Sequence, residues 1–241
     1  MSAPADLIVR LVGLLDLTSL NDGRDDDIAA LCAKALTPLG PVAAVCSWPE
    51  FTQDMVRQVA GRGPKVAVVI DFPAGQGAPD DVQAEASQAV RDGADELDLV
   101  WPYRTWQAGD REGAIALVRA VKAASGGARL KVILETGVLQ NPDLIAAASR
   151  DAIEGGADML KTSSGKTASG ASLPAAEAML RAIHASGREV GFKASGGIGT
   201  VEQAAAYLNL AEDIMGAGWA TPAHFRIGAS RLLDALLKAA E

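Results

Sequence analysis

The stretch Gly93-Ala94-Asp95-Glu96-Leu97-Asp98-Leu99-Val100 decides the fold, because it joins the end of a helix to the start of a strand. The same signal returns at Gly156-Ala157-Asp158, which is followed by Met159-Leu160-Lys161. In both places a glycine closes an alanine-containing segment of helical period, and a short strand-like run follows at once. This repeated Gly-Ala-Asp signal predicts a chain built from regular helix-and-strand units.

Eight short apolar runs alternate with segments of helical period, and their mean spacing of roughly 30 residues is the size of one βα unit. The expected strands are Leu11–Thr18, Val42–Trp48, Val66–Phe72, Glu96–Pro102, Leu130–Thr136, Met159–Ser163, Val190–Ser195 and Phe225–Gly228. This pattern predicts a single α/β domain over residues 1–241, folded as a TIM (β/α)8 barrel. An open doubly wound sheet is the alternative, but it usually has a glycine-rich turn after its first strand, and Asp16-Leu17-Thr18-Ser19 is not one.

Start and stop signals of helices support the alternation. Asn141 before Pro142 predicts a helix N-cap with proline at the first helical position. Thr200 with Gln203 has the spacing of a capping box. Glycines at 155 and 187 stand where helices are expected to end.

Composition narrows the classes of partner and compartment. The formal net charge is −8, which argues against a nucleic-acid or anionic-membrane binder, because both need basic patches. Cys32 and Cys46 are the two cysteines, and we expect reduced thiols of a cytoplasmic protein. Residues 1–6 lack a basic segment followed by an apolar one, so we expect no signal peptide, and no apolar run is long enough to span a bilayer.

Polar residues interrupt the expected strands with a period of two. A buried parallel strand should be apolar throughout, so these interruptions need a reason. The residues concerned are Asp16 and Thr18, Glu96 and Asp98, Lys131 and Glu135, Lys161 and Ser163, and Lys193 and Ser195. The alternation puts each polar set on one face of its strand, and because the apolar set must meet the helices, the polar set must face the barrel interior.

Lys161 and Lys193 are the candidate reactive pair, because they lie late on neighbouring strands and therefore near one another at the catalytic face. A solvated lysine has a pKa of about 10.4 and is protonated at neutral pH. Burial and a neighbouring cation both lower that pKa, which leaves a neutral amine able to form a Schiff base. Asp98 could pair with the lysine that stays charged and help move protons. For Lys131, Glu135 and Glu96, a paired ion network is an equally good interpretation.

Three glycine-bearing turns follow the last three expected strands. They are Ser164-Gly165-Lys166, Gly196-Gly197-Ile198-Gly199 and Gly228-Ala229-Ser230. Glycines let backbone N–H groups approach an anion, helix N-termini favour negative charge, and the loops after strands seven and eight are the usual phosphate site of this barrel. We therefore expect a phosphate site there, to which Lys166 adds a positive charge.

Taken together, these motifs resemble those of the deoxyribose-phosphate aldolase family, and they span nearly the whole chain in order. They are Leu15-Asp16-Leu17-Thr18 with Asn21, Asp71-Phe72-Pro73 with Gly75, Gly93-Ala94-Asp95-Glu96-Leu97-Asp98 with Pro102-Tyr103-Arg104, Lys131-Val132-Ile133-Leu134-Glu135-Thr136-Gly137, Lys161-Thr162-Ser163-Ser164-Gly165-Lys166, Gly191-Phe192-Lys193-Ala194-Ser195-Gly196-Gly197 and Gly228-Ala229-Ser230. The resemblance implies a TIM-barrel lyase, a class I aldolase of deoxyribonucleoside breakdown that acts through a Schiff base.

The resemblance also implies residue roles. Lys161 matches the Schiff-base lysine, Lys193 the lysine that lowers its pKa, and Asp98 the aspartate of the proton relay. The reaction implied is reversible cleavage of 2-deoxy-D-ribose 5-phosphate into acetaldehyde and D-glyceraldehyde 3-phosphate, without a metal or an organic cofactor, in a cytoplasmic homodimer. Substrate and phosphate binding are expected at Asp16, Thr18, Thr162, Gly165, Lys166, Gly196, Gly197, Ile198, Gly228, Ser230 and Arg231.

The chain departs from the family pattern at the phosphate site. Gly199 stands where many members have arginine, and Arg231 stands where a small residue is common, so we hypothesise that Arg231 partly replaces the missing guanidinium. Some members also have a longer tail ending in tyrosine, whereas this sequence stops at Glu241. Two alternatives remain open: a Schiff-base aldolase for another phosphosugar or a keto acid, and a catalytically silent barrel that binds phosphorylated metabolites.

Overall fold

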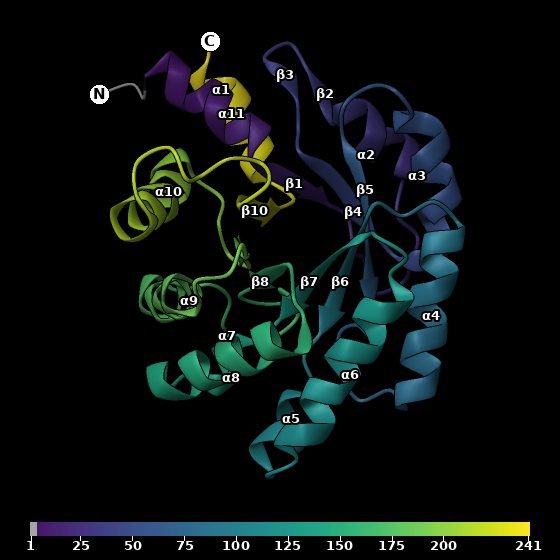
Figure 1. Ribbon diagram of the computed structural model, residues 1–241. Helices are drawn as coiled ribbons and strands as arrows, with labels where there is room; N and C mark the ends of the chain where they lie inside the picture. The colour runs from purple at the N-terminus through teal and green to yellow at the C-terminus, as the bar shows by residue number, and fades with distance from the viewer. Residues whose placement is uncertain (1–3) are drawn as a thin grey trace.

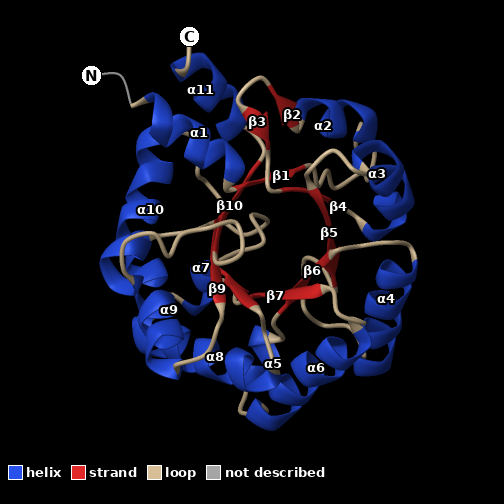
Figure 2. Ribbon diagram, turned by 45° about the horizontal axis from the view of Figure 1, so that its top comes forward, coloured by secondary structure: helices blue, strands red, loops and turns tan. Residues whose placement is uncertain are grey.

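The computed structural model describes residues 4–241, in which eight parallel strands close into a barrel. The strands follow the order β1-β10-β9-β8-β7-β6-β5-β4, and β4 pairs with β1 to complete the ring. Figure 2 shows this ring of strands surrounded by helices. The eight strands are β1 Leu15–Thr18, β4 Ala44–Ser47, β5 Lys65–Ile70, β6 Glu96–Val100, β7 Arg129–Ile133, β8 Met159–Lys161, β9 Gly191–Ser195 and β10 Phe225–Ala229. The predicted TIM barrel is confirmed, and the open doubly wound sheet is wrong.

Helices connect the strands along the chain and cover the outside of the barrel, and α1 and α11 lie side by side near the two ends of the chain (Figure 1). The helices are α1 Ala5–Gly13, α2 Ile28–Lys34, α3 Thr52–Val59, α4 Pro79–Arg91, α5 Tyr103–Gln107, α6 Arg111–Ala124, α7 Thr136–Leu139, α8 Pro142–Gly155, α9 Leu173–Ser186, α10 Val201–Met215 and α11 Leu232–Ala239. A 3-10 turn covers Pro49–Phe51, and a small hairpin joins β2 Leu36–Thr37 to β3 Gly40–Pro41. Within residues 4–241, no helix is long and apolar enough to cross a bilayer.

The predicted helix boundaries are confirmed. Asn141 caps α8 and accepts hydrogen bonds from the first-turn amides, and Thr200 forms the capping box of α10 with Gln203. Gly155 is the last residue of α8, and Gly187 caps α9 in a left-handed conformation, with φ of 63°.

Most expected strands run one to three residues too far, and two of them, Leu11–Thr18 and Leu130–Thr136, extend into helices. Leu11–Gly13 belong to α1, because Ile8, Leu11 and Val12 bury one face at helical spacing, and a short run of apolar residues does not separate the two periods. The expected strand Leu130–Thr136 is too long at its C-terminal end, because β7 stops at Ile133 and the chain turns sharply at Glu135. The expectation about residues 1–6 partly concerns residues 1–3, which lie outside the described residues.

The alternation along the strands separates an outer and an inner layer, as predicted. Leu97 and Leu99 join the apolar core between barrel and helices, whereas Glu96 and Asp98 are buried without belonging to it. A buried charge costs several kcal/mol unless it is paired. The barrel interior must therefore supply partners for these carboxylates.

Candidate active site

Strand register brings Lys161, Lys193 and Asp98 to one point inside the barrel. In the register, Lys161 is opposite Lys193 on β9 and Ile133 on β7, and Asp98 lies one strand further along. The Nζ atoms of Lys161 and Lys193 each lie 2.8 Å from Asp98 Oδ2. The two amines are therefore less than twice that distance apart, and each side chain is at most 1% exposed.

The lysine pair belongs to a larger buried ion network. Lys131 lies 2.6 Å from Asp98 and 2.7 Å from Glu96, and Lys193 lies 2.6 Å from Asp16. The paired network that the sequence allowed for Lys131 and Glu96 is thus present, whereas Glu135 is not a member of it. The cations of the network are Lys131, Lys161, Lys193 and Arg226, and its anions are Asp16, Glu96 and Asp98.

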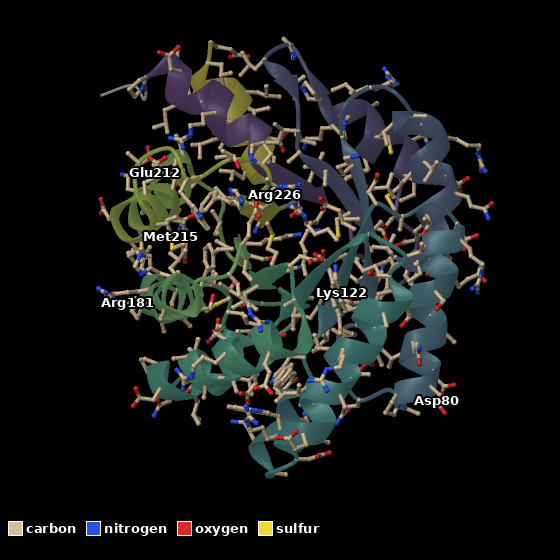
Figure 3. The ribbon with its side chains drawn as sticks, in the orientation of Figure 1. Asp80, Lys122, Arg181, Glu212, Met215 and Arg226 are labelled. Atoms are coloured by element: carbon tan, nitrogen blue, oxygen red, sulfur yellow. The ribbon has the colours of Figure 1, made fainter. Side chains whose placement is uncertain are left out.

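Arg226 is a member that the sequence analysis missed. It lies inside the barrel at β10, in contrast to Arg181 on an outer helix (Figure 3). Its guanidinium contacts Asp16 at 2.5 Å and Glu96 at 2.9 Å. The sequence could have identified it, because Arg226 stands between the apolar Phe225 and Ile227 in an expected strand and two residues before Gly228, on the same inward face.

The network holds one more cation than anions. If all members were ionised, one uncompensated positive charge would be buried, and loss of a proton from a lysine is the least costly way to remove it. Burial lowers the pKa of Lys161, and Lys193 lowers it further against the opposing effect of Asp98. For Lys193, burial alone would lower the pKa, but Asp16 and Asp98 outweigh it and raise the pKa. Lys161 is therefore the amine that most readily becomes neutral.

Asp98 is the shared acceptor of this arrangement. Burial would raise the pKa of Asp98, but Lys131, Lys161 and Lys193 together hold it well below its usual value. The group remains a carboxylate, and its Oδ2 accepts a hydrogen bond from both reactive lysines. A proton can therefore pass between the two amines through a single oxygen atom.

A cavity of about 340 Å³ lies beside this network, formed by the loops after β1, β8, β9 and β10. Nine of the residues expected to bind substrate or phosphate line it: Thr18, Gly165, Lys166, Gly196, Gly197, Ile198, Gly228, Ser230 and Arg231. The lining also includes Ser164, Gly199 and Ala229, which belong to the three expected glycine-bearing turns. Ser19, Leu20, Asn21 and Ser195 line it as well and were not expected to bind.

Asp16 and Thr162 lie elsewhere. Asp16 is committed to Lys193 and Arg226 in the ion network. The Thr162 hydroxyl donates to the Ser195 carbonyl and accepts from the Ser195 amide, both at 2.9 Å. Thr162 therefore ties β8 to β9, next to the cavity wall rather than in it.

Glycines shape the cavity where it meets the lysines. Gly196 and Gly197 have φ of 95° and 84°, a backbone conformation that residues with a side chain rarely adopt. A Cβ atom on Gly228 would lie 2.9 Å from Lys193 Cε and 2.9 Å from Ser195 Oγ. The bare backbone of Gly228 thus leaves the room that the Lys193 side chain occupies.

Two basic side chains line the same cavity. Lys166 pairs with the exposed Asp22 of the loop after β1, and other residues of that loop also line the cavity. Arg231 is exposed at the N-cap of α11 and forms no ion pair with any residue in the described part of the chain. Together with the nearby N-terminus of α10, these groups favour an anionic ligand.

An apolar wall with Cys46 borders the lysines. Cys46 belongs to a small buried cluster with Ala44, Trp48, Ala67 and Val69 inside the barrel. Burial and the charge of Asp98 raise the pKa of the Cys46 thiol to about 11, so it stays protonated and unreactive near neutral pH. Within residues 4–241, no cluster of three or more His, Cys, Asp or Glu side chains has the arrangement of a metal site.

The profile of the DeoC/LacD family aldolases matches residues 12–238. The chain belongs to this family. It is 47% identical to the deoxyribose-phosphate aldolase of Agrobacterium fabrum, over 98% of this chain and 93% of the relative. The family resemblance found in the sequence is confirmed.

Solved structures of this aldolase family share the fold. A Toxoplasma gondii protein assigned as a deoxyribose-phosphate aldolase, in its apo form, superposes with a TM-score of 0.87 at 30% identity, covering 98% of this chain and 96% of the other. The deoxyribose phosphate aldolase of Aeropyrum pernix, a tetramer, superposes with a TM-score of 0.78 at 26% identity, covering 98% and 92%.

Proposed function

We propose that the protein is a lyase that reversibly cleaves 2-deoxy-D-ribose 5-phosphate to acetaldehyde and D-glyceraldehyde 3-phosphate, through a Schiff base on Lys161. The observation that carries the proposal is the position of Lys161. It is a buried amine of lowered pKa, it shares the Asp98 carboxylate with Lys193, and it lies beside a cavity suited to an anion. The membership of the chain in the DeoC/LacD aldolases selects this chemistry among the reactions open to a neutral lysine.

The first step is attack by the neutral Lys161 Nζ on C1 of the open-chain sugar. The carbinolamine that forms loses water and becomes an iminium ion. Asp98 Oδ2 and the protonated Lys193 lie on the same side as the reacting amine and supply or remove the protons that this dehydration needs. Lys193 is protonated before and after this exchange, because Asp16 and Asp98 raise its pKa.

The second step breaks the bond between C2 and C3. The C3 hydroxyl gives its proton to Asp98 Oδ2, the carboxylate oxygen beside the reacting amine, and becomes the aldehyde of D-glyceraldehyde 3-phosphate, while the electrons of the broken bond pass into the iminium to give an enamine. Protonation of the enamine carbon and hydrolysis by water then release acetaldehyde and restore the Lys161 amine. The apolar wall with Cys46 and Val69 suits the two-carbon fragment, which has no charge.

The phosphate is assigned to the cavity. Gly165, Gly196 and Gly197 offer backbone approach, and Lys166 and Arg231 offer positive charge. Thr18, Ile198, Gly228 and Ser230 complete the lining of the proposed substrate site. Asp16 and Thr162 are assigned indirect roles, because Asp16 orients Lys193 and Thr162 fixes the neighbouring strand.

The remaining assignments follow from the same proposal. Residues 1–241 act as one catalytic domain on small phosphosugar and aldehyde substrates, with neither a metal nor an organic cofactor in the chemistry proposed. We place the enzyme in the cytoplasm, as a homodimer, without nucleic-acid or membrane partners. Sedimentation analysis of the purified chain tests the dimer against the tetramer described for the Aeropyrum pernix protein.

Reduction with borohydride in the presence of acetaldehyde tests the proposal directly. The expected result is a covalent adduct that peptide mass mapping places on Lys161 and that Lys161→Arg abolishes. Lys122→Arg is a matched control, because Lys122 pairs with Asp158 outside the barrel interior. An adduct formed only on other lysines would refute the nucleophile, and absence of any adduct would favour a barrel that only binds phosphorylated metabolites.

Rates on 2-deoxy-D-ribose 5-phosphate, unphosphorylated deoxyribose and a phosphorylated keto acid test the substrate. The proposal expects the highest kcat/KM for 2-deoxy-D-ribose 5-phosphate. A higher value for another phosphosugar or for a keto acid would assign the chain to that substrate instead.

A further inference from the structure

Glu135 is a buried carboxylate outside the ion network of the lysines. It is 0% exposed and stands between β7 and α7. Its φ of 55° and ψ of 57° place a residue with a long side chain in the left-handed region, which such residues seldom occupy. Within the described residues, no basic side chain forms an ion pair with it. The fold therefore holds this carboxylate in place by hydrogen bonds alone.

All the hydrogen bonds that the Glu135 carboxylate accepts come from one loop, the segment that leaves β8 after Lys161. The Ser164 amide approaches both carboxylate oxygens, at 3.4 and 3.3 Å, and the Ser164 hydroxyl donates a further bond. The Thr167 hydroxyl lies 3.2 Å from Glu135 Oε1 and 3.1 Å from the Ser169 carbonyl oxygen, so these two acceptors share its one proton. The buried carboxylate accepts from two donor groups of Ser164 and shares the Thr167 hydroxyl with a carbonyl of the same loop, and it holds the loop because a buried acceptor without a partner would be costly.

The same loop is held on both sides by close backbone contacts. A Cβ on Gly137 would lie 1.9 Å from the Ser169 carbonyl oxygen, so the chain next to Glu135 passes directly under the loop. A Cβ on Gly170 would lie 2.4 Å from the Gly196 carbonyl oxygen, and the Ala171 amide donates to that oxygen at 3.0 Å. The loop is thus packed between the end of β7 and the glycine turn after β9.

The hydrogen bonds from Ser164 and Thr167 to Glu135 are called the clamp below. The clamped loop, residues 164–167, is also a wall of the proposed phosphate site. Ser164, Gly165 and Lys166 line the cavity, and the Lys166 amide donates to the Ser164 hydroxyl that in turn donates to Glu135. Glu135 itself does not line the cavity. It therefore acts on a ligand there through the position of the loop.

We propose that Glu135 is a positioning residue that fixes residues 164–167 in the conformation that receives the substrate phosphate. This inference rests on the proposed function for its kinetic consequence, although the order of the loop can be measured without any substrate. A loop that is ordered before binding spares the ligand the entropy of ordering it, so loss of the clamp weakens binding of the phosphate more than it slows the chemistry at Lys161.

Glu135→Gln tests the proposal, because the amide keeps the size of the side chain but removes the charge and replaces one acceptor with a donor. The expected result is a KM for 2-deoxy-D-ribose 5-phosphate raised about tenfold, with kcat and the rate on unphosphorylated deoxyribose changed less than about threefold. The acid limb of the pH–rate profile stays where it is in the wild type. Glu135→Asp keeps the carboxylate on a shorter side chain, and its KM is expected to lie between those of the wild type and Glu135→Gln.

Limited trypsin digestion of the native protein gives a readout independent of activity. Residue 166 is an exposed lysine on the loop, so release of the clamp is expected to accelerate cleavage after Lys166, and inorganic phosphate is expected to slow it. Asp151→Asn is the matched control: Asp151 is also a buried carboxylate, but it pairs with Arg111 on the outside of the barrel. This control is expected to leave both the loop and the KM unchanged.

Thr167→Val serves as a milder variant if Glu135→Gln does not fold. It removes the hydroxyl that Glu135 shares with the Ser169 carbonyl and is expected to raise the same KM about two- to threefold. Unchanged KM and unchanged trypsin cleavage would overturn the proposal, and so would an equal loss of kcat on both sugars or a displaced pH limb. If the wild type fails to cleave 2-deoxy-D-ribose 5-phosphate, the proposed function fails, and cleavage after Lys166 alone decides the role of Glu135.

Discussion

Replacing Lys193 with methionine tests the electrostatic reasoning about Lys161 most directly. Lys193 is fully buried and shares Asp98 Oδ2 with Lys161. Without it, three cations face three carboxylates, and the balanced state of the network is the one in which Lys161 keeps its proton. We therefore expect the pKa of Lys161 to rise in Lys193→Met and the neutral amine to become rare at neutral pH.

The size of the effect follows from the geometry. Both amines lie 2.8 Å from one oxygen, which bounds their separation. At a separation of about 5 Å and an effective dielectric constant of about 20, two unit charges repel by about 3 kcal/mol. That energy corresponds to a shift of about 2 pKa units, or about a 100-fold loss of neutral amine below the pKa.

The assay is the pH dependence of kcat/KM for the retro-aldol reaction. Activity requires the neutral amine, so it rises with pH through the pKa of Lys161, and the acid limb of the variant should lie about 2 pH units higher than that of the wild type. Activity should accordingly recover at high pH. Lys131→Met is the comparison, because it removes the same charge from the network, but Lys131 contacts the other oxygen of Asp98 and its loss should move the limb less. An equal loss at every pH, with the limb unmoved, would refute the reasoning.

Three further variants probe the walls of the cavity. Gly228→Ala should lower kcat at least tenfold with a smaller change in stability, because its Cβ would displace the Lys193 side chain; thermal denaturation beside kinetics separates the two. Arg231→Ala should raise the KM for 2-deoxy-D-ribose 5-phosphate about three- to tenfold and leave unphosphorylated deoxyribose unaffected; an unchanged KM would exclude a compensating guanidinium. Asp22→Asn releases Lys166 from its exposed partner and should lower that KM about two- to threefold at low salt, a gain that added salt should erase.

Most of the fold could be predicted from the sequence, because each barrel unit repeats the same local signals. Asn141 with Pro142 and Thr200 with Gln203 mark helix starts by hydrogen bonds that form within one turn, so they need no tertiary context. The error at Leu11–Gly13 has the opposite cause. A run of leucine and valine fits a buried strand and a buried helix equally well, and packing against the barrel decides between them.

Part of the candidate site could be predicted from the sequence for a similar reason. Polar residues at a period of two identified Asp98, Lys131, Lys161 and Lys193 as inward-facing, because strand geometry fixes which side chains share a face. The sequence could not predict which of these side chains are in contact, because the contacts depend on the stagger between strands. Thr162 illustrates the limit: it stands next to the reactive lysine in sequence, yet its hydroxyl bonds to the backbone of β9.

The order of reactivity between the two lysines arises only when the barrel closes. By local sequence, Lys161 and Lys193 are equivalent, since each is an inward lysine on a short strand. Asp16 breaks the equivalence by contacting Lys193 at 2.6 Å, and these two residues lie on β1 and β9, which are separated by β10. The intervening strand carries glycine at 228, opposite Asp16 in the register, so no side chain separates the carboxylate from the amine. The proton therefore stays on Lys193, and Lys161 becomes the nucleophile, through a contact that pairing of β1 with β10 creates.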